Sequence, residues 1–224
     1  MFDKGIIFDI QRFSLNDGDG IRTTIFFKGC YLRCAWCHNP ESIAPEIQLN
    51  HNPKKCTLCG KCVDFVNGDG IEIVEDKLRI DFNKHNQNFD LINVCPNNAY
   101  SKFGKAYSVD EVVAIVMKDL VYYKNSNGGV TFSGGEAINQ VDFLNQLGKK
   151  LKSLNINMCL DMSGYDPLFK VRETLSYIDR YLLDYKVSDQ STYEKYIGPK
   201  NNFKEIIDFL AKNNKDVTLR CPII

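Results

Sequence analysis

The sequence has no excess of charge of either sign: 28 Lys and Arg residues balance 28 Asp and Glu residues, and the formal net charge is zero. Such a balance gives no electrostatic footprint for nucleic acid or for an anionic membrane. No apolar run approaches the roughly 20 residues that a membrane helix needs. The first residues, MFDKGIIFDIQRF, lack the basic start and the long apolar core of a signal peptide. We therefore expect a cytoplasmic protein whose partners include no nucleic acid and no membrane.

A disulfide framework is also not expected. The chain has nine cysteines, an odd number, and no export signal accompanies them. Seven of the nine fall in spacings typical of metal ligands, which indicates a reducing cytoplasm and, if the clusters are exposed, an anaerobic one. The other two, Cys159 and Cys221, lie within strand patterns and are expected to be small buried side chains.

The most informative stretch runs from Gly18 to Asn39, GDGIRTTIFFKGCYLRCAWCHN. It holds Cys30, Cys34 and Cys37 in the spacing C-x3-C-x2-C, and three soft thiolates this close suit an iron–sulfur cluster or zinc. In a [4Fe–4S] cluster, three cysteines leave one iron open to a substrate or cofactor. The β-branched and aromatic run at 24–27 predicts a buried strand just before them. The cysteines therefore follow the carboxyl end of a strand, where α/β folds carry their chemistry.

From residue 108 onward, helical patterns alternate with strand patterns. Ser108 and Glu111 form a capping-box pattern ahead of the first helix. Apolar residues then recur at helical spacing in four segments, each followed by a short apolar strand. The strands are expected at 129–133, 157–161, 181–184 and 217–220. Together with the strand near 23–28, they predict an α/β fold with five core strands in a parallel sheet and right-handed crossovers.

Residues 50–105 differ in character and indicate an insert, because they are polar and rich in Asn and Lys. Cys56, Cys59 and Cys62 resemble a bacterial ferredoxin run, and Cys95, in a Cys-Pro pair, resembles its closing half. The ligands of one ferredoxin cluster are thus complete, whereas those of a second cluster are missing. We expect one auxiliary [4Fe–4S] cluster ligated entirely by protein, with zinc as the alternative.

The flanks of the cysteine stretch resemble the radical S-adenosylmethionine (SAM) enzymes, and within them the glycyl radical enzyme activating enzymes, relatives of pyruvate formate-lyase activating enzyme. The matching positions are Gly18, Gly20, Arg22, Phe26, Gly29, the three cysteines and Asn39. The resemblance implies a partial (β/α)6 radical SAM barrel over residues 1–49 and 106–224, with the ferredoxin-like insert at 50–105 between them. Because relatives continue into a further strand, the resemblance also implies that the chain is C-terminally incomplete.

The resemblance further implies that Cys30, Cys34 and Cys37 hold a [4Fe–4S] cluster whose fourth iron is chelated by SAM; a structural zinc knuckle is the alternative. Successive strand ends would then contact SAM, with the two glycines of a Gly-Gly-Glu segment admitting the ligand close to the backbone and a monovalent cation lying near Asp161. The expected SAM-binding residues are Trp36, Cys37, His38, Gly134, Gly135, Glu136, Asp161, Asp184, Tyr185 and Lys186. Taken alone, these strand-end patterns are equally typical of a strand–helix turn or a charged strand end.

The activity that the resemblance implies is reductive cleavage of SAM to a 5′-deoxyadenosyl radical, which abstracts a Cα hydrogen from a glycine of a partner glycyl radical enzyme. Flavodoxin or ferredoxin would donate the electron, and the auxiliary cluster would serve electron relay, structure or docking. No side-chain acid or base is needed, so none is predicted. Two alternatives stay open: a radical SAM enzyme acting on another protein, peptide or small molecule, and a non-enzymatic iron–sulfur protein for electron transfer or binding. The sequence names neither the partner enzyme nor the oligomeric state.

Overall fold

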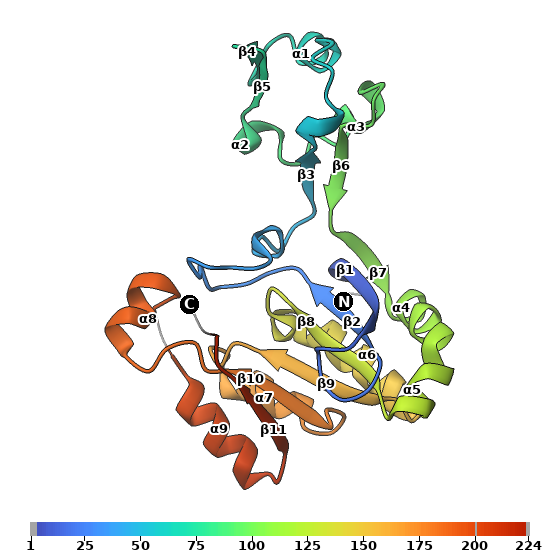
Figure 1. The fold of residues 1–224 in the computed structure, drawn as a ribbon, viewed down its shortest axis with the longest axis vertical. Helices are drawn as coiled ribbons and strands as arrows, with labels where there is room; N and C mark the ends of the chain where they lie inside the picture. Colours follow the sequence, from blue (N-terminus) through green and yellow to red (C-terminus); the bar gives the residue numbers. More distant parts are fainter. Residues whose placement is uncertain (1–3, 200, 223–224) are drawn as a thin grey trace. The chain divides into compact units, whose positions relative to one another are not determined.

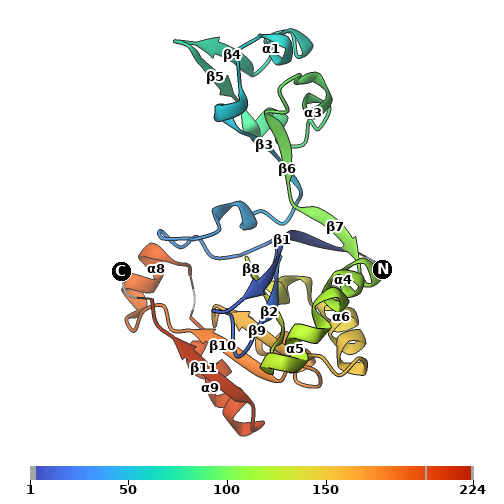
Figure 2. The same cartoon turned by 45° about the vertical axis from the view of Figure 1, so that its right-hand side comes forward.

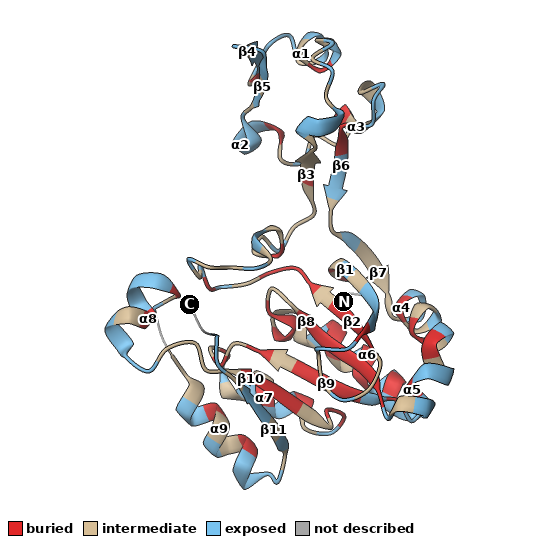
Figure 3. Cartoon of the chain, in the orientation of Figure 1, coloured by how far each residue is buried: buried red, intermediate tan, exposed pale blue. Residues whose placement is uncertain are grey.

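The computed structural model describes residues 4–199 and 201–222. The chain divides into two compact units, one comprising Met1–Pro45 and Ala106–Ile224 and the other comprising Glu46–Lys105. Each unit has a hydrophobic core of its own, and Figure 3 shows the buried residues concentrated in the strands and helices of the larger one. Within the described ranges, no helix combines the length and the apolar character that crossing a membrane requires.

The larger unit is built on a seven-stranded sheet with the order β11-β10-β9-β8-β2-β1-β7 (Figure 1). Its strands are β1 (Lys4–Ser14), β2 (Arg22–Phe27), β7 (Lys105–Ser108), β8 (Gly129–Gly134), β9 (Asn157–Met162), β10 (Arg180–Asp184) and β11 (Asp216–Arg220). The five strands from β2 to β11 in this order pair in parallel, whereas β1 pairs with β2 antiparallel. The sheet confirms the α/β class and the five parallel strands that the alternating pattern predicts.

The helices of the larger unit connect these strands. They are α4 (Val109–Val116), α5 (Leu120–Ser126), α6 (Val141–Ser153), α7 (Leu168–Thr174), α8 (Gln190–Tyr196) and α9 (Phe203–Lys212), with 3-10 turns at Pro40–Ser42, Met117–Asp119 and Ala137–Gln140. The predicted capping box of α4 is present, since Ser108 and Glu111 each accept a hydrogen bond from the other's amide. Because the strand order from β2 to β11 never reverses, right-handed crossovers place successive helices on one face of the sheet. Figure 2 shows α4 and α6 side by side on it.

The smaller unit contains two short antiparallel sheets. Its elements are β3 (Gln48–His51), a 3-10 turn at Pro53–Lys55, α1 (Lys61–Phe65), β4 (Ile71–Val74), β5 (Lys77–Ile80), α2 (Phe82–His85), α3 (Leu91–Val94) and β6 (Tyr100–Phe103). Strand β3 pairs with β6, and β4 pairs with β5. Because β3 pairs with β6, the unit begins before residue 50. Its buried core consists of Leu49, Cys62, Ile71, Leu91 and Tyr100.

The two cysteines outside the metal-like spacings differ from each other. Cys159 in β9 is 1% exposed, as the strand pattern predicts. The prediction for Cys221 is wrong, because its side chain is exposed. The last residue of β11 that pairs with β10 is Arg220, so Cys221 lies just beyond the sheet, where no neighbouring strand covers it.

Arg22 at the start of β2 anchors the loop that precedes it. The side chain is 1% exposed, and its guanidinium donates to Thr131 Oγ1 at 2.7 Å, to the Val130 carbonyl at 2.6 Å and to the Asp19 carbonyl at 3.1 Å. Gly20 lies in the same loop at φ +71°, and a Cβ there would be 2.4 Å from the Ser126 carbonyl oxygen. Two features of the G-x-G-x-R pattern therefore hold this loop against the start of β8. Gly20 is small enough for the close approach, and the planar guanidinium of Arg22 donates several hydrogen bonds.

We predict that Arg22→Lys lowers the free energy of unfolding by about 2 kcal/mol or more, since lysine leaves buried acceptors without a donor. Arg172→Lys is the control, because Arg172 is exposed on α7, and its effect should stay within about 0.5 kcal/mol. Denaturant unfolding of both variants under anaerobic conditions measures the difference. Equal effects of the two substitutions would contradict the anchoring role of Arg22.

Candidate active site

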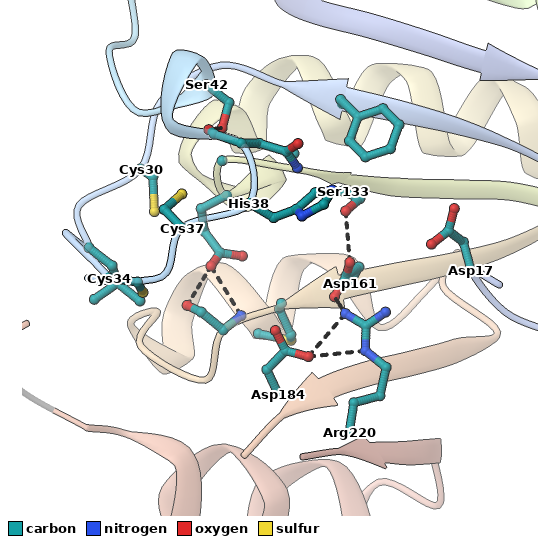
Figure 4. A pocket seen from close by; sticks show the side chains of 18 of the residues that line it. Asp17, Cys30, Cys34, Cys37, His38, Ser42, Ser133, Asp161, Asp184 and Arg220 are labelled. Carbon is teal, nitrogen blue, oxygen red and sulfur yellow. Dashed lines mark hydrogen bonds and ion pairs between the residues drawn. The ribbon is translucent and has the colours of Figure 1, made fainter. Parts of the chain in front are cut away.

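A cavity of about 700 Å³ opens at the carboxyl ends of the parallel strands of the larger unit (Figure 4). Each of these strands contributes a residue at or near its last position, so side chains from distant parts of the sequence meet there. These residues are Phe26 of β2, Ser133 and Gly134 of β8, Asp161 and Met162 of β9, Asp184 of β10 and Arg220 of β11. The cavity thus lies where the strand pattern predicts the chemistry of the fold.

The loop after β2 brings the three cysteines to this cavity. Gly29, at φ +99°, turns the chain out of the strand, and its amide donates to the Ser42 carbonyl at 2.7 Å. Farther along, the Arg33 amide donates to the Ile197 carbonyl at 2.8 Å, which holds the loop against the end of α8. All three predicted ligands line the cavity, and Figure 4 shows them on the same side of it: Cys30, Cys34 and Cys37.

The thiols fit a site for a metal cluster by their chemistry. Burial, and then the nearby charge of Glu136, raises the pKa of Cys30 to about 12, and burial raises the pKa of Cys34. A thiol in these surroundings keeps its proton unless a metal cation replaces it. In the part of the chain that the structure describes, no three Cys, His, Asp or Glu side chains converge as a preformed metal site. Cluster ligation by these thiols is therefore part of the function proposed below.

The Gly-Gly-Glu segment joins the end of β8 to the cysteine loop. The Gly135 amide donates to the Phe27 carbonyl at 2.8 Å, and the Glu136 amide donates to the Gly29 carbonyl at 2.9 Å. A Cβ at Gly134 would lie 2.3 Å from the Phe27 amide nitrogen, and one at Gly135 would lie 2.7 Å from the Gly29 oxygen. Both glycines line the cavity, and their small size also admits the end of β2 and the start of the cysteine loop.

Glu136 is buried beside a second carboxyl group. Its Oε2 accepts hydrogen bonds from the Ser163 amide at 3.1 Å and the Ser163 hydroxyl at 2.5 Å. Oε1 of Glu136 and both carboxyl oxygens of Asp166 are buried, and among the described residues the one hydrogen bond open to them is a proton shared between the two carboxyl groups. Burial and the neighbouring Asp166 raise the pKa of Glu136, and burial raises the pKa of Asp166 to about 7. This carboxyl pair can accept hydrogen bonds from a cationic or amino group of a ligand.

Asp161 and Asp184 form a second acidic group, which protein cations compensate. Arg220 forms an ion pair with Asp161 and a second one with Asp184 at 3.0 Å. Lys186 lies 2.8 Å from the other oxygen of Asp184, and the Ser133 hydroxyl donates to Asp161 at 2.7 Å. Burial raises the pKa of Asp161, and Arg220 opposes that shift. The guanidinium therefore supplies positive charge where the resemblance implies a monovalent cation.

Of the remaining residues expected to bind SAM, two line the cavity and one lies outside its lining. Trp36 and His38 line the cavity. Tyr185 is not among the lining residues, and its ring packs on Phe203 of α9 with centroids 4.8 Å apart. In extended backbone, alternate side chains point to opposite faces, so the Asp-x-Lys pattern brings Asp184 and Lys186 to the cavity and turns Tyr185 away from it.

The four cysteines of the smaller unit also come together. Cys56, Cys59, Cys62 and Cys95 line one small pocket, together with Tyr100. The Ala99 amide donates to the Cys95 sulfur at 3.4 Å. Amide donation to sulfur and a set of four thiols are both features of protein sites for iron–sulfur clusters.

The similarities to known proteins point in the same direction. A family model described as a 4Fe-4S single cluster domain matches residues 16–201. The 4-hydroxyphenylacetate decarboxylase activating enzyme of Clostridium scatologenes is 37% identical over 100% of this chain and 74% of its own length. The (2S)-3-sulfopropanediol dehydratase activating enzyme of Klebsiella oxytoca is 38% identical, over 98% of this chain and 71% of its own length. The trans-4-hydroxy-L-proline dehydratase activating enzyme of Clostridioides difficile is 34% identical, over 98% and 73%. The chain belongs to the glycyl radical enzyme activating enzymes.

Membership of the activating enzymes confirms the family inferred from the cysteine stretch. A solved domain of the pyruvate-formate lyase-activating enzyme from Bacteroides vulgatus ATCC 8482 is 25% identical, over 43% of this chain and 61% of its own, with a TM-score of 0.39. A score this low supports no assignment of the fold. The fold assignment of this activating enzyme therefore rests on the strand order and strand pairing of its own sheet.

Several cavity residues of this activating enzyme escape the sequence patterns. Asp17 lines the cavity, and its carboxylate accepts hydrogen bonds from Ser14 and from Thr24 at 2.6 Å. In the sequence, Asp17 is marked only by its position directly before Gly18 of the glycine motif. Arg220 ends the last parallel strand, as Asp161 and Asp184 end theirs, so the same strand-end rule identifies it. Ser163 and Asp166 lie in the loop after β9, where no motif marks them.

We predict that Arg220→Met lowers the free energy of unfolding of this activating enzyme by about 2 kcal/mol, less than for a fully buried pair because the Arg220 side chain is 33% exposed. The substitution leaves Asp161 and Asp184 close together without the guanidinium. Arg180→Met is the matched control, since Arg180 also bridges two acids, Asp19 and Asp216, but these are exposed. Denaturant unfolding compares the two variants.

The deficit of Arg220→Met should also depend on pH. Loss of the guanidinium raises the pKa of Asp161 further, and a carboxyl group with a raised pKa in the folded state destabilises the fold increasingly as pH rises from its unfolded-state pKa to its folded-state pKa. The deficit relative to wild type should therefore be larger at pH 8 than at pH 5. A pH-independent deficit, or one no larger than that of Arg180→Met, would contradict this account.

Proposed function

We propose that this activating enzyme binds a [4Fe–4S] cluster through Cys30, Cys34 and Cys37, and SAM in the cavity beside them. The observation that carries the proposal is that these cysteines line the same cavity as Glu136 and Lys186. When bound, the cluster supplies the electron that cleaves SAM to the 5′-deoxyadenosyl radical, which takes a Cα hydrogen from a glycine of the partner glycyl radical enzyme. The chain's own residues bind SAM, orient it and exclude water.

Glu136 binds the amino group of SAM through its Oε1. That oxygen is buried, and no donor outside the Glu136–Asp166 pair reaches it in the described residues, whereas Ser163 fixes Oε2 with two hydrogen bonds. The carboxylate is therefore held in one orientation before the ligand arrives, which reduces the entropy lost on binding. Burial raises the pKa of both Glu136 and Asp166, so the ionised form of this pair is favoured when a ligand that carries positive charge binds beside it.

The adenosine part of SAM lies against Trp36 and His38. Both side chains line the cavity, and Trp36 packs on the cluster of Leu32, Tyr193 and Ile197, which keeps its ring in place. Lys186 follows the carboxyl end of β10 and is held by Asp184 at 2.8 Å. It supplies a hydrogen-bond donor at that end of the cavity. Since Arg220 already pairs with both Asp161 and Asp184, a monovalent cation at this group stays a prediction.

The larger unit corresponds in this proposal to a partial (β/α)6 radical SAM barrel. Five consecutive parallel strands with a common direction of crossover support it. The smaller unit corresponds to a ferredoxin-like insert with one auxiliary [4Fe–4S] cluster on Cys56, Cys59, Cys62 and Cys95, which line one pocket. Flavodoxin or ferredoxin is the proposed electron donor.

The partner is to be sought among several glycyl radical enzymes. Relatives at 37%, 38% and 34% identity are named as activating enzymes of a decarboxylase and of two different dehydratases. Identities this similar favour none of these partners. The activation experiment therefore uses a panel that contains the decarboxylase and both dehydratases.

We predict that the reconstituted enzyme, with SAM and dithionite under anaerobic conditions, generates a glycyl radical on one partner of such a panel. The radical is detected by its EPR signal on the partner. Cys34→Ala should abolish the signal, because it removes one of the three thiolates that hold the cluster. Cys221→Ser is the matched control: this cysteine also lines the cavity but lies outside the motif, so the variant should keep the radical yield within about twofold.

The other outcomes identify the alternatives. Cleavage of SAM without a radical on any partner would favour a radical SAM enzyme acting on a different substrate. Iron-loaded protein that does not cleave SAM would favour a non-enzymatic electron-transfer or binding role. Full activity in Cys34→Ala would contradict the proposed ligands.

A further inference from the structure

The smaller unit contains a tyrosine hydroxyl that no contact explains. Tyr100, at the start of β6, is 3% exposed, and its hydroxyl oxygen is buried without a hydrogen-bond partner in the described residues. A buried hydroxyl without a partner costs about 1–3 kcal/mol, and phenylalanine would fill the same space without that cost. The hydroxyl therefore calls for a hydrogen-bond acceptor at this site.

The surroundings of Tyr100 indicate what that partner is. The side chain lines the same small pocket as the four cysteines and packs with Cys62 in one buried cluster. A phenol hydroxyl can donate one hydrogen bond, and the cysteine sulfurs line the same pocket. A thiolate sulfur bound to iron is a hydrogen-bond acceptor at this place.

The backbone fixes the tyrosine in this position. His51 of β3 is the register partner of Tyr100 in the β3–β6 pair, and the two rings lie with centroids 5.0 Å apart. The preceding residue, Ala99, donates its amide to the Cys95 sulfur at 3.4 Å. Two consecutive residues thus lie at the cysteine set: the Ala99 amide donates to Cys95, and the Tyr100 side chain packs with Cys62.

We propose that the Tyr100 hydroxyl donates a hydrogen bond to the Cys62 sulfur of the auxiliary cluster and thereby raises the reduction potential of that cluster. The proposal rests on the auxiliary [4Fe–4S] cluster of the proposed function. A donor to sulfur stabilises the reduced cluster, which carries the additional negative charge, more than the oxidised one. Tyr100 is in this sense a positioning residue, which acts on the cluster through the Cys62 ligand.

The test compares Tyr100→Phe with its parent in a background where Cys30, Cys34 and Cys37 are all replaced by alanine, so that only the auxiliary cluster gives a signal. Both proteins should hold about four irons per chain. In an anaerobic redox titration followed by EPR, the ratio of reduced to oxidised cluster at a fixed potential should fall by up to about tenfold in Tyr100→Phe, a shift of ~59 mV to more negative potential for one electron. Tyr122→Phe in the larger unit is the control and should not shift the potential.

A second measurement covers the case in which Tyr100→Phe fails to fold or loses its iron. Tyr100 is the only tyrosine between residues 46 and 105, so fluorotyrosine incorporated throughout the parent alters one tyrosine of this unit. Fluorination makes the phenol a stronger donor, and the potential should move in the positive direction. An unchanged potential in a fully loaded Tyr100→Phe variant, or in the fluorinated parent, would overturn the proposal. A parent that binds no iron would instead show that the auxiliary cluster itself is absent.

Discussion

Two backbone hydrogen bonds join the end of β8 to the start of the cysteine loop, and the active site depends on them. They run from the Gly135 amide to the Phe27 carbonyl and from the Glu136 amide to the Gly29 carbonyl. The glycines allow these two segments of the chain to approach each other this closely. Since backbone atoms make the contact, the thiols and the Glu136 carboxylate are held at one cavity by the fold. The ligand has to bind to this arrangement but does not have to create it.

The acids at the cavity form two groups with different electrostatics: Glu136, Asp161 and Asp184 line it, and Asp166 is buried next to Glu136. Asp161 and Asp184 pair with Arg220 and Lys186, so their charge is compensated within the protein. Glu136 and Asp166 retain buried oxygens that no described donor outside the pair reaches, and their pKa values are raised by burial. The uncompensated pair lies toward the cysteine loop, because Glu136 is bonded to it. In the proposed complex, the amino group of SAM therefore binds at this pair, toward the cysteine loop.

The sequence predicts those features that depend on local periodicity and on motifs. The alternating pattern predicts the five parallel strands, and the capping box of α4 is present at Ser108. The cysteine motif leads to the correct family. Contacts between strand ends are harder to predict from the sequence. The pairs Ser133–Asp161 and Asp161–Arg220 are 28 and 59 residues apart in the chain, and local periodicity carries no information about contacts at such separations. Tyr185 is expected from a motif to bind SAM, whereas its side chain packs on Phe203 outside the cavity lining, as the alternation of an extended chain requires.

The central claim is that this cavity binds SAM beside a cluster held by Cys30, Cys34 and Cys37. The most direct measurement is the yield of 5′-deoxyadenosine from SAM in the anaerobically reconstituted, dithionite-reduced protein, without any partner enzyme, with iron counted on the same sample. The account predicts about eight irons per chain, from two [4Fe–4S] clusters, and formation of 5′-deoxyadenosine that Glu136→Gln strongly reduces. Fully loaded protein that leaves SAM intact would contradict it.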